Sequence, residues 1–505
     1  MLRKLLAAAL LLSALPAAAQ DLKSFEASTT IHVLPNGWTF ILVERHEAPV
    51  FSFSTLAKVG SAQEGAGITG LAHMFEHMAF KGTESIGTTN YPEEKKAIAA
   101  LEAAYQAYQA ERLSPRGDAR KVAALLETFK ARQAEANKFV VKNEFGEIIN
   151  REGGIFMNAF TNTDETVFFY GLPANKTELW AFLESERFLH PVFREFYEER
   201  DVVHEERRQN TEGQPIGRMV EQFQAAAFVA HAYHHPTVGY ESDLQSFTLT
   251  DAEAFFREQY APGNLVTAVV GDIHPKELIP LIDRYFGRIP RRPLPPPLRT
   301  VEPPQTAEKI VIIEDLSQPI YLEAYHKPAD TDPDQPAYEA IDDILSNGRT
   351  SRLYRSLVRD KQLAVQVQSF SGYPGKIYPN LWAILAVPGF GITNEQVQTA
   401  LRAEIERLKT EDVTDEDLSR FKTRAKARLV YSLRDNQGLA NQLTAYQHLY
   451  GDWRELFRSI DRFDKVTKAD IRRVANQAFQ KENRTVTMLV TKKAPAAAPS
   501  APGTR

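Results

Sequence analysis

Apolar residues along the chain follow two periods, one typical of strands and one typical of helices. Short runs rich in β-branched and aromatic residues, such as 38–43 and 309–314, predict strands. Two longer stretches, 173–209 and 388–429, each run from a strand end into an amphipathic helix, then through a short acidic connection into a longer charged helix. This loose repeat, with strands and helices alternating in both halves, predicts a duplicated fold that combines sheets with helices.

A proline-rich segment divides the chain. Repeated prolines in residues 291–305 preclude a helix or a central strand and favour an extended linker. The sequence therefore predicts an N-terminal domain over residues 21–290 and a homologous C-terminal domain over residues 306–492. Beyond them, the Ala- and Pro-rich residues 493–505 predict a disordered tail.

Residues 91–140 differ from the rest of the N-terminal domain, because they are rich in Ala, Glu, Lys, Gln and Arg. Apolar positions recur there at helical spacing on both sides of a turn at 114–118, which predicts a helical hairpin inserted into the domain. Such a hairpin either packs on the domain surface or serves as an arm that docks a partner or gates a substrate.

Residues 1–20 have the pattern of a secretory signal peptide. Arg3 and Lys4 form a basic start, residues 5–15 are apolar, and small residues at 17–19 suit a cleavage site. The alternative is a membrane anchor, but the apolar run is shorter than the roughly 20 residues that span a bilayer. We therefore expect an exported chain without a membrane span, located in the periplasm.

Composition excludes several classes of protein. A hydrophobic share of 43% with 25% charged residues is ordinary for a globular chain and argues against global disorder. The formal net charge of -5 gives no field that would hold a nucleic acid. Because the chain has no Cys, no disulfide can form, so packing or a bound metal must stabilise the fold.

Residues 70–83 carry the clearest chemical signal. On a helix, His73 and His77 lie one turn apart on the same face, so two imidazoles can bind one metal ion, and Glu76 lies beside them. Zn²⁺ accepts such ligands, and its catalytic sites use three protein ligands and one water. A neighbouring carboxylate can take the proton of that water. The pattern H-x-x-E-H therefore predicts a catalytic zinc site with one Zn²⁺ per chain.

This motif resembles that of the pitrilysin and insulinase-like zinc metallopeptidases, the inverzincins. Their signature reads G-x-A-H-x-x-E-H-x-x-F-K-G-T, and the chain matches it over residues 70–83. Further segments in both halves also resemble the family, namely residues 158–166, 199–206, 266–272, 285–287 and 351–354. The resemblance implies an α+β fold of two homologous domains that form half of a clam-shell chamber, and a zinc endopeptidase that cleaves unfolded peptides.

Carried over by position, the resemblance implies a role for each matching residue. His73, His77 and Glu206 would be the zinc ligands, Glu76 the general base, and Glu199 the residue that orients a ligating histidine. Glu205 is the competitor of Glu206, but it lies about 100° away around the helix, whereas Glu199 and Glu206 share one face. The resemblance also implies that Asn158 and Ala159 lie on the edge strand that aligns the peptide substrate.

The second half departs from the family pattern. Family members complete their active site with an Arg and a Tyr near L-R-x-x-x-x-L-x-Y, and here Val365 lies near the tyrosine position. Valine has no hydroxyl to donate to an oxyanion. In two-chain members a homologous subunit supplies the Arg and Tyr, so the resemblance implies that this chain is the zinc subunit of a heterodimer.

Two other interpretations remain open. A homodimeric peptidase could use another hydroxyl, such as that of Tyr373. The chain could instead be a non-catalytic assembly or scaffold subunit that keeps the peptidase fold. Glu76 favours catalysis over the scaffold, because a structural zinc site has no use for a neighbouring base.

Overall fold

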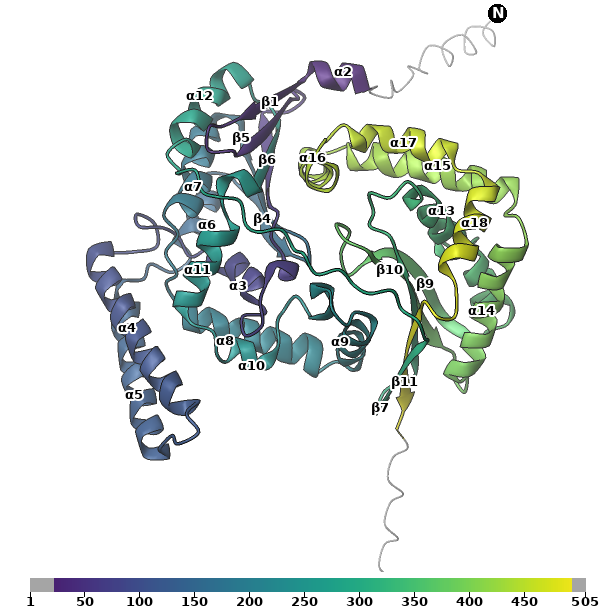
Figure 1. The fold of residues 1–505 in the computed structure, drawn as a ribbon. Helices are drawn as coiled ribbons and strands as arrows, with labels where there is room; N and C mark the ends of the chain where they lie inside the picture. The colour runs from purple at the N-terminus through teal and green to yellow at the C-terminus, as the bar shows by residue number, and fades with distance from the viewer. Residues whose placement is uncertain (1–21, 493–505) are drawn as a thin grey trace, which may run out of the picture.

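A computed structural model describes residues 22–492. The predicted signal peptide (1–20) and tail (493–505) lie outside the described residues. Two β-sheets, each with helices packed against it, form the two halves of the molecule (Figure 1). This arrangement confirms the expected α+β class. Within residues 22–492, no helix is both long and apolar enough to cross a bilayer.

The first half holds a six-stranded sheet in the order β1-β2-β6-β3-β5-β4. Its strands are β1 (Thr29–Val33), β2 (Thr39–Glu44), β3 (Val50–Ala57), β4 (Ile155–Thr161), β5 (Thr166–Pro173) and β6 (Leu265–Gly271). Its helices are α2 (Leu22–Ala27), α3 (Leu71–Met78), α4 (Tyr91–Arg112), α5 (Ala119–Ala136), α6 (Glu144–Arg151), α7 (Thr177–Leu189), α8 (Phe196–Arg207), α9 (Pro215–Ala227), α10 (Glu241–Leu244), α11 (Leu249–Gln259) and α12 (Pro275–Phe286).

The second half holds a five-stranded sheet in the order β7-β11-β8-β10-β9. Its strands are β7 (Lys309–Asp315), β8 (Ile320–Lys327), β9 (Ala364–Tyr373), β10 (Asn380–Pro388) and β11 (Arg484–Thr491). Its helices are α13 (Gln335–Ser346), α14 (Asn394–Thr410), α15 (Asp415–Ser432), α16 (Asn436–Tyr450), α17 (Glu455–Lys465) and α18 (Lys468–Ala478).

The two sheets repeat one topology. In the first, β2 pairs in parallel with β6, and β3, β5 and β4 follow in antiparallel pairs. In the second, β7 pairs in parallel with β11, and β8, β10 and β9 follow in antiparallel pairs. Chain order also matches, since β2 to β6 correspond one by one to β7 to β11. This correspondence is the structural form of the loose sequence repeat.

Each half covers one face of the other half's sheet. Helix α16 of the second half packs on β3 and β6, where Leu439 and Leu443 meet Val266 and Val270. Helix α9 of the first half packs on the second sheet, where Phe223 lies in one apolar cluster with that sheet. Strand β6 is buried at every position because helices cover both of its faces, so its sequence shows no polar alternation.

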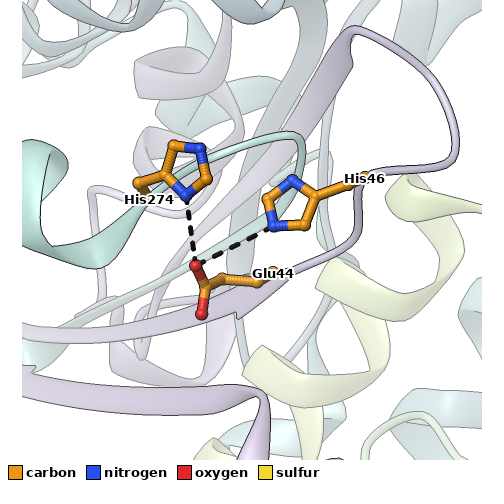
Figure 2. A group of neighbouring side chains, drawn as sticks. All are labelled: Glu44, His46 and His274. Carbon is orange, nitrogen blue, oxygen red and sulfur yellow. Dashed lines mark hydrogen bonds and ion pairs between the residues drawn. The ribbon is translucent and has the colours of Figure 1, made fainter.

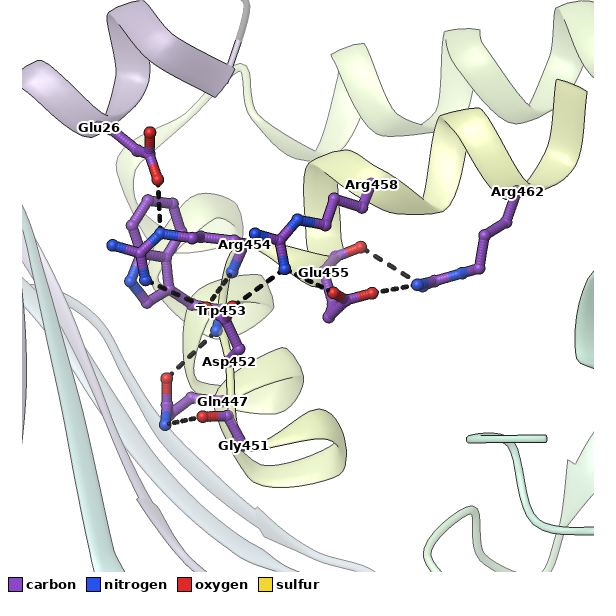
Figure 3. Close-up of polar contacts among 9 residues, drawn as sticks. All are labelled: Glu26, Gln447, Gly451, Asp452, Trp453, Arg454, Glu455, Arg458 and Arg462. Atoms are coloured by element: carbon purple, nitrogen blue, oxygen red, sulfur yellow. Dashed lines mark hydrogen bonds and ion pairs between the residues drawn. The ribbon is translucent and has the colours of Figure 1, made fainter. Parts of the chain in front are cut away.

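Contacts between α2 and the start of α17 join the halves. Figure 3 shows Glu26 of α2 accepting a hydrogen bond from Arg454, near the start of α17, at 2.5 Å. Beneath this ion pair, Phe25 packs against Trp453 and Phe457, with ring centroids 5.5 and 4.7 Å away. The proline-rich segment, residues 291–305, is also held against the first half. Its Glu302 accepts hydrogen bonds from three consecutive backbone amides, those of residues 229–231.

The helices α4 and α5 pack on each other as a hairpin that projects from the first half (Figure 1). Its base is fixed by a buried ion pair, in which Arg194 donates to both carboxylate oxygens of Glu94 at 2.8 and 3.1 Å. Arg194 also donates to the backbone carbonyls of Lys81, Thr83 and Ile86. The hairpin is therefore anchored to the loop that follows α3.

Candidate metal centre

Helix α3 carries His73, Glu76 and His77. Its apolar side chains are buried in the first core, which leaves the two histidines together on the opposite, partly exposed face. Gly70 precedes the helix as its N-cap residue, with a φ of 98°, a left-handed conformation that favours glycine. Glu64 accepts hydrogen bonds from the amides of Gly70 and Ala72 at 2.8 and 2.7 Å, which fixes the first turn.

Helix α8 packs against α3 and carries Glu199 and Glu206. His73 Nε2 and His77 Nε2 lie 3.5 and 3.9 Å from Glu206 Oε2. These three atoms lie within 4.8 Å of one another. For a tetrahedral Zn²⁺ with bonds of about 2.1 Å, neighbouring ligand atoms are about 3.4 Å apart. Two nitrogens and one oxygen at this spacing fit a zinc ion with an open fourth position.

Glu199 fixes the orientation of His77. Its carboxylate lies 3.3 Å from His77 Nδ1, on the ring edge opposite the nitrogen that faces Glu206. Lys81 holds the other oxygen of Glu199 at 2.5 Å and also contacts Glu195 at 3.1 Å. A carboxylate on the far nitrogen selects the tautomer that leaves Nε2 free to bind a metal.

The local environment shifts the protonation of these residues in opposite directions. Burial, with a smaller effect from His77, lowers the pKa of His73 to about 4. Burial also acts to lower the pKa of His77, but the hydrogen bond that His77 donates to Glu199 and the surrounding carboxylates raise this pKa overall. The neutral ring that binds a metal is therefore favoured for His73, whereas protons compete more strongly with a metal for His77.

Glu76 lies on the same helix, between His73 and His77 in the sequence. Burial raises the pKa of its carboxyl above the ordinary value, although hydrogen bonding with Thr161 and the charge of His77 oppose this shift. Thr161 is the last residue of β4, so Glu76 lies beside the end of that strand. A carboxyl whose pKa is raised can accept a proton and release it again at a pH closer to neutrality.

Strand β4 is the outermost strand of the first sheet, and among the described residues its free edge pairs with no other strand. Asn158 is exposed and Ala159 is buried, as expected for successive residues of a strand with one covered face. The register shifts between Ile155 and Asn158, where Phe156 has a φ of 56° and is 74% exposed. The structure thus places both residues on an open edge that leads to Glu76.

The second half has no group of three potential metal ligands among residues 22–492. Arg359 is exposed and pairs with the adjacent Asp360 at 2.6 Å. Val365, at the start of β9, is 65% exposed. Tyr373 donates a hydrogen bond to Gln224 of α9 at 3.0 Å, so its hydroxyl is already engaged with a helix other than α3 or α8.

Three positioning residues of this centre were not identified from the sequence, namely Glu64, Lys81 and Arg194. Lys81 lies shortly after α3, within the F-K-G-T part of the matched signature, so its place in the motif could have drawn attention to it. Glu64 and Arg194 act on backbone groups of α3 and of the loop after it. Such contacts depend on tertiary packing and leave no local pattern.

Two family models match separate parts of the chain. The model of the insulinase peptidase family, M16, matches residues 40–115, and the model of the M16 inactive domain matches residues 246–425. The zinc protease PqqE of Helicobacter pylori is 27% identical over 466 residues, which cover 90% of this chain and 91% of that protein. The comparisons support the M16 peptidase family. Glu199 and Glu206 lie between the two matched ranges.

Solved protein structures share the fold of this chain. The crystal structure of a protease from Helicobacter pylori is 25% identical, with a TM-score of 0.77, and the match covers 92% of this chain and 99% of that one. The periplasmic protease PqqL from Escherichia coli is 17% identical, with a TM-score of 0.67, and shares the fold. The match covers 92% of this chain but 47% of PqqL, so this chain corresponds to about half of that protein.

Proposed function

We propose that the protein is a zinc-dependent endopeptidase whose metal is held by His73, His77 and Glu206. The observation that carries this proposal is the meeting of two helices: α3 brings both histidines and Glu76 to the face where α8 brings Glu206. Relatives named as zinc proteases support the same chemistry.

The residues divide the reaction between them. A Zn²⁺ ion in such a site supplies Lewis acidity, which polarises a substrate carbonyl and makes water more acidic. Glu76 takes the proton from the attacking water and passes it to the leaving amine. Glu199 holds the ring of His77 in place, and Lys81 holds Glu199.

An unfolded peptide is the substrate that the site fits best. An extended chain can add to the free edge of β4 beside Asn158 and Ala159, with backbone hydrogen bonds supplying affinity. Thr161 at the end of β4 lies against Glu76. A peptide paired with the free edge of β4 would therefore pass close to the proposed base. Backbone pairing alone reads no side chains, so selectivity has to come from neighbouring pockets.

A homologous subunit would complete the active site in a periplasmic heterodimer. Val365 offers no hydrogen-bond donor where the family pattern places a tyrosine. The match to about half of the longer periplasmic PqqL supports an active unit made of two such chains. The partner would supply the Arg and Tyr that stabilise the oxyanion.

The alternative is a non-catalytic assembly subunit that retains the fold. The family model over residues 246–425 describes an inactive domain, which favours this alternative for the second half. The pairing of Glu76 with three potential ligands favours catalysis by the first half.

The test is hydrolysis of an unfolded, fluorogenic peptide by the zinc-loaded chain from residue 21, alone and with proteins that copurify from the native host. We expect the Glu76→Gln variant to retain zinc and lose hydrolysis. Equal turnover by the wild type and this variant would overturn the assignment of Glu76 as the base. Activity confined to the copurified complex supports the heterodimer, and full activity of the isolated chain contradicts it. Zinc binding without hydrolysis in either sample would favour the assembly subunit.

A further inference from the structure

A second group of potential metal ligands lies at the opposite end of the first sheet. Glu44, His46 and His274 each offer one ligand atom, and the three atoms lie within 4.8 Å of one another (Figure 2). Helix α3 comes after β3, whose last residue pairs with the first residue of β6. His274 comes after the last residue of β6, at the opposite end of the same strand. The two groups are thus separated by the length of a seven-residue strand, about 20 Å.

Sheet topology explains why these residues meet. Strands β2 and β6 are parallel neighbours, and Glu44 at the end of β2 pairs with Gly271 at the end of β6. Parallel strands end at the same edge of a sheet, so residues just beyond both strands are brought together. His46 lies two residues after β2, and His274 caps the start of α12.

Backbone contacts hold this corner in place. The amide of Arg45 donates to the carbonyl of Gly271 at 2.9 Å, and the amide of Asp272 donates to the carbonyl of Val50 at 3.0 Å. Gly271 has a φ of 140°, and a Cβ there would lie 2.4 Å from the carbonyl oxygen of Val50. The loops that carry the two histidines are therefore close and fixed, which lowers the cost of arranging ligands around an ion.

The spacing of the ligand atoms resembles that of the candidate zinc centre. Glu44 Oε1 lies 3.4 Å from His274 Nδ1 and 3.9 Å from His46 Nε2. In the first centre the corresponding distances to Glu206 are 3.5 and 3.9 Å. Both sets are close to the roughly 3.4 Å between neighbouring ligands of a tetrahedral ion.

The contact between His46 and the carboxylate of Asp272 also has a counterpart in the candidate zinc centre. His46 Nδ1 lies 2.7 Å from the carboxylate of Asp272, which leaves Nε2 facing Glu44. Glu199 makes the same kind of contact with His77. A carboxylate on the outer nitrogen is typical of histidines that ligate metals.

We propose that Glu44, His46 and His274 form a second, surface site for Zn²⁺, or for another divalent transition ion that prefers imidazole ligands. This inference does not rest on the proposed peptidase activity. The side chains of His46 and His274 are about half exposed, at 47% and 58%, so an ion can reach the site directly from solvent.

The site lies beside a contact between the two halves. Arg45, between Glu44 and His46, donates to the backbone carbonyls of Leu433 and Arg434 after α15 at 3.1 and 3.4 Å. An ion held by the residues on either side of Arg45 fixes the loop that makes this contact. Bound Zn²⁺ therefore stabilises the folded chain through mass action, because the unfolded chain lacks the arranged ligands.

The test is zinc stoichiometry of the tag-free chain from residue 21, measured by elemental analysis after metal removal, reloading and dialysis. We expect about two Zn²⁺ per wild-type chain, about one for the double variant His46→Ala/His274→Ala, and about one for His73→Ala/His77→Ala. The matched control is His32→Ala, since His32 also pairs with a carboxylate, that of Asp283, but belongs to no three-ligand group among the described residues.

The outcomes separate the two sites. Equal stoichiometry in wild type and His46→Ala/His274→Ala would overturn the inference and leave the four side chains as surface ion pairs. Loss of zinc from His73→Ala/His77→Ala alone would support only the first centre. Asp272→Asn should keep both histidines and weaken the second site by about 10- to 100-fold. Thermal unfolding without metal should be similar in all these variants, which checks that they fold.

Discussion

At the residue scale, the choice between Glu205 and Glu206 shows what helical phase can decide. The structure places Glu206 against both histidines, whereas Glu205 pairs with Arg208 at 2.7 Å on the exposed side of α8. Since Glu199 is two turns before Glu206, both carboxylates reach α3 from one face. The sequence could therefore distinguish adjacent glutamates once a helix was assumed.

The first prediction concerns this pair. We expect Glu206→Gln to lose tightly bound zinc, because a neutral amide replaces a carboxylate ligand, and to lose peptide hydrolysis with it. Glu205→Gln is the matched control and should keep both. Isothermal titration with Zn²⁺ measures the difference, and equal affinity of the two variants would contradict the assigned ligand.

The second prediction concerns Glu199, which contacts His77 and Lys81. Replacing it with Gln should lower zinc affinity by about 10- to 100-fold, because the ring of His77 loses the carboxylate that orients it. Lys81→Met should produce a smaller loss in the same direction, because Glu199 stays but becomes less fixed. Competition with a chelator measures both, and unchanged affinity of Glu199→Gln would refute its positioning role.

The third prediction is a pH dependence at the contact between the halves. Burial, with a further contribution from Asp164, raises the pKa of Glu165 to about 7. The pKa of Glu165 is higher in the folded chain than in the unfolded chain. The contribution of this carboxyl to the free energy of unfolding is therefore fully present below about pH 4.5 and is lost as the pH rises through about 7. Glu165 keeps some contact with solvent, so about 3 kcal/mol is an upper bound for this loss.

Glu165→Gln should remove that part of the pH dependence. Chemical denaturation between pH 5 and 8 measures it, with wild type and variant compared at each pH. A variant whose stability still falls as steeply as that of the wild type would show that other groups cause the loss.

At the element scale, the hairpin shows where sequence reasoning succeeds and where it stops. Its two helices were predicted because apolar residues such as Leu101, Tyr105 and Phe129 recur at helical spacing, and the structure buries all three. Its anchor was not predictable, because Glu94 and Arg194 are separated by 100 residues and resemble ordinary surface charges. Charged pairs of this kind become visible only after the elements are packed.

The fourth prediction tests that anchor. We expect Glu94→Gln to destabilise the first half by about 3–5 kcal/mol, because Arg194 is left as a buried charge without its partner. Glu93, exposed on the same turn, provides the control variant Glu93→Gln, which should change stability by less than about 0.5 kcal/mol. Urea denaturation measures both, and equal stability of the two variants would contradict the anchoring role.

At the scale of the whole molecule, duplication and exchange of helices explain the arrangement of the halves. In the sequence, the repeated order of strands could be seen only as a loose similarity. The pairings of β4 with β5 and of β9 with β10 each contain a shift in register, and that register depends on tertiary contacts. The packing of α16 on the first sheet and of α9 on the second could not be predicted, since neither helix differs in pattern from helices that cover their own sheet.

The fifth prediction concerns the contact made by α2 with the second half. Trp453→Ala should destabilise the molecule by about 3–5 kcal/mol, because it removes the ring that packs on Phe25 and leaves a cavity. Glu26→Gln affects only the more exposed ion pair with Arg454 and should cost about 0–1 kcal/mol. Thermal unfolding compares the two, and similar midpoints would contradict a packed contact between the halves.

The most direct test of the central proposal is anomalous X-ray scattering at the zinc edge from crystals of the zinc-loaded protein. The geometry predicts a peak enclosed by His73 Nε2, His77 Nε2 and a carboxylate oxygen of Glu206. The Glu76→Gln variant should show the same peak, because Glu76 is assigned to proton transfer and not to metal binding. Zinc-loaded crystals with no peak at this position would contradict the proposed metal centre.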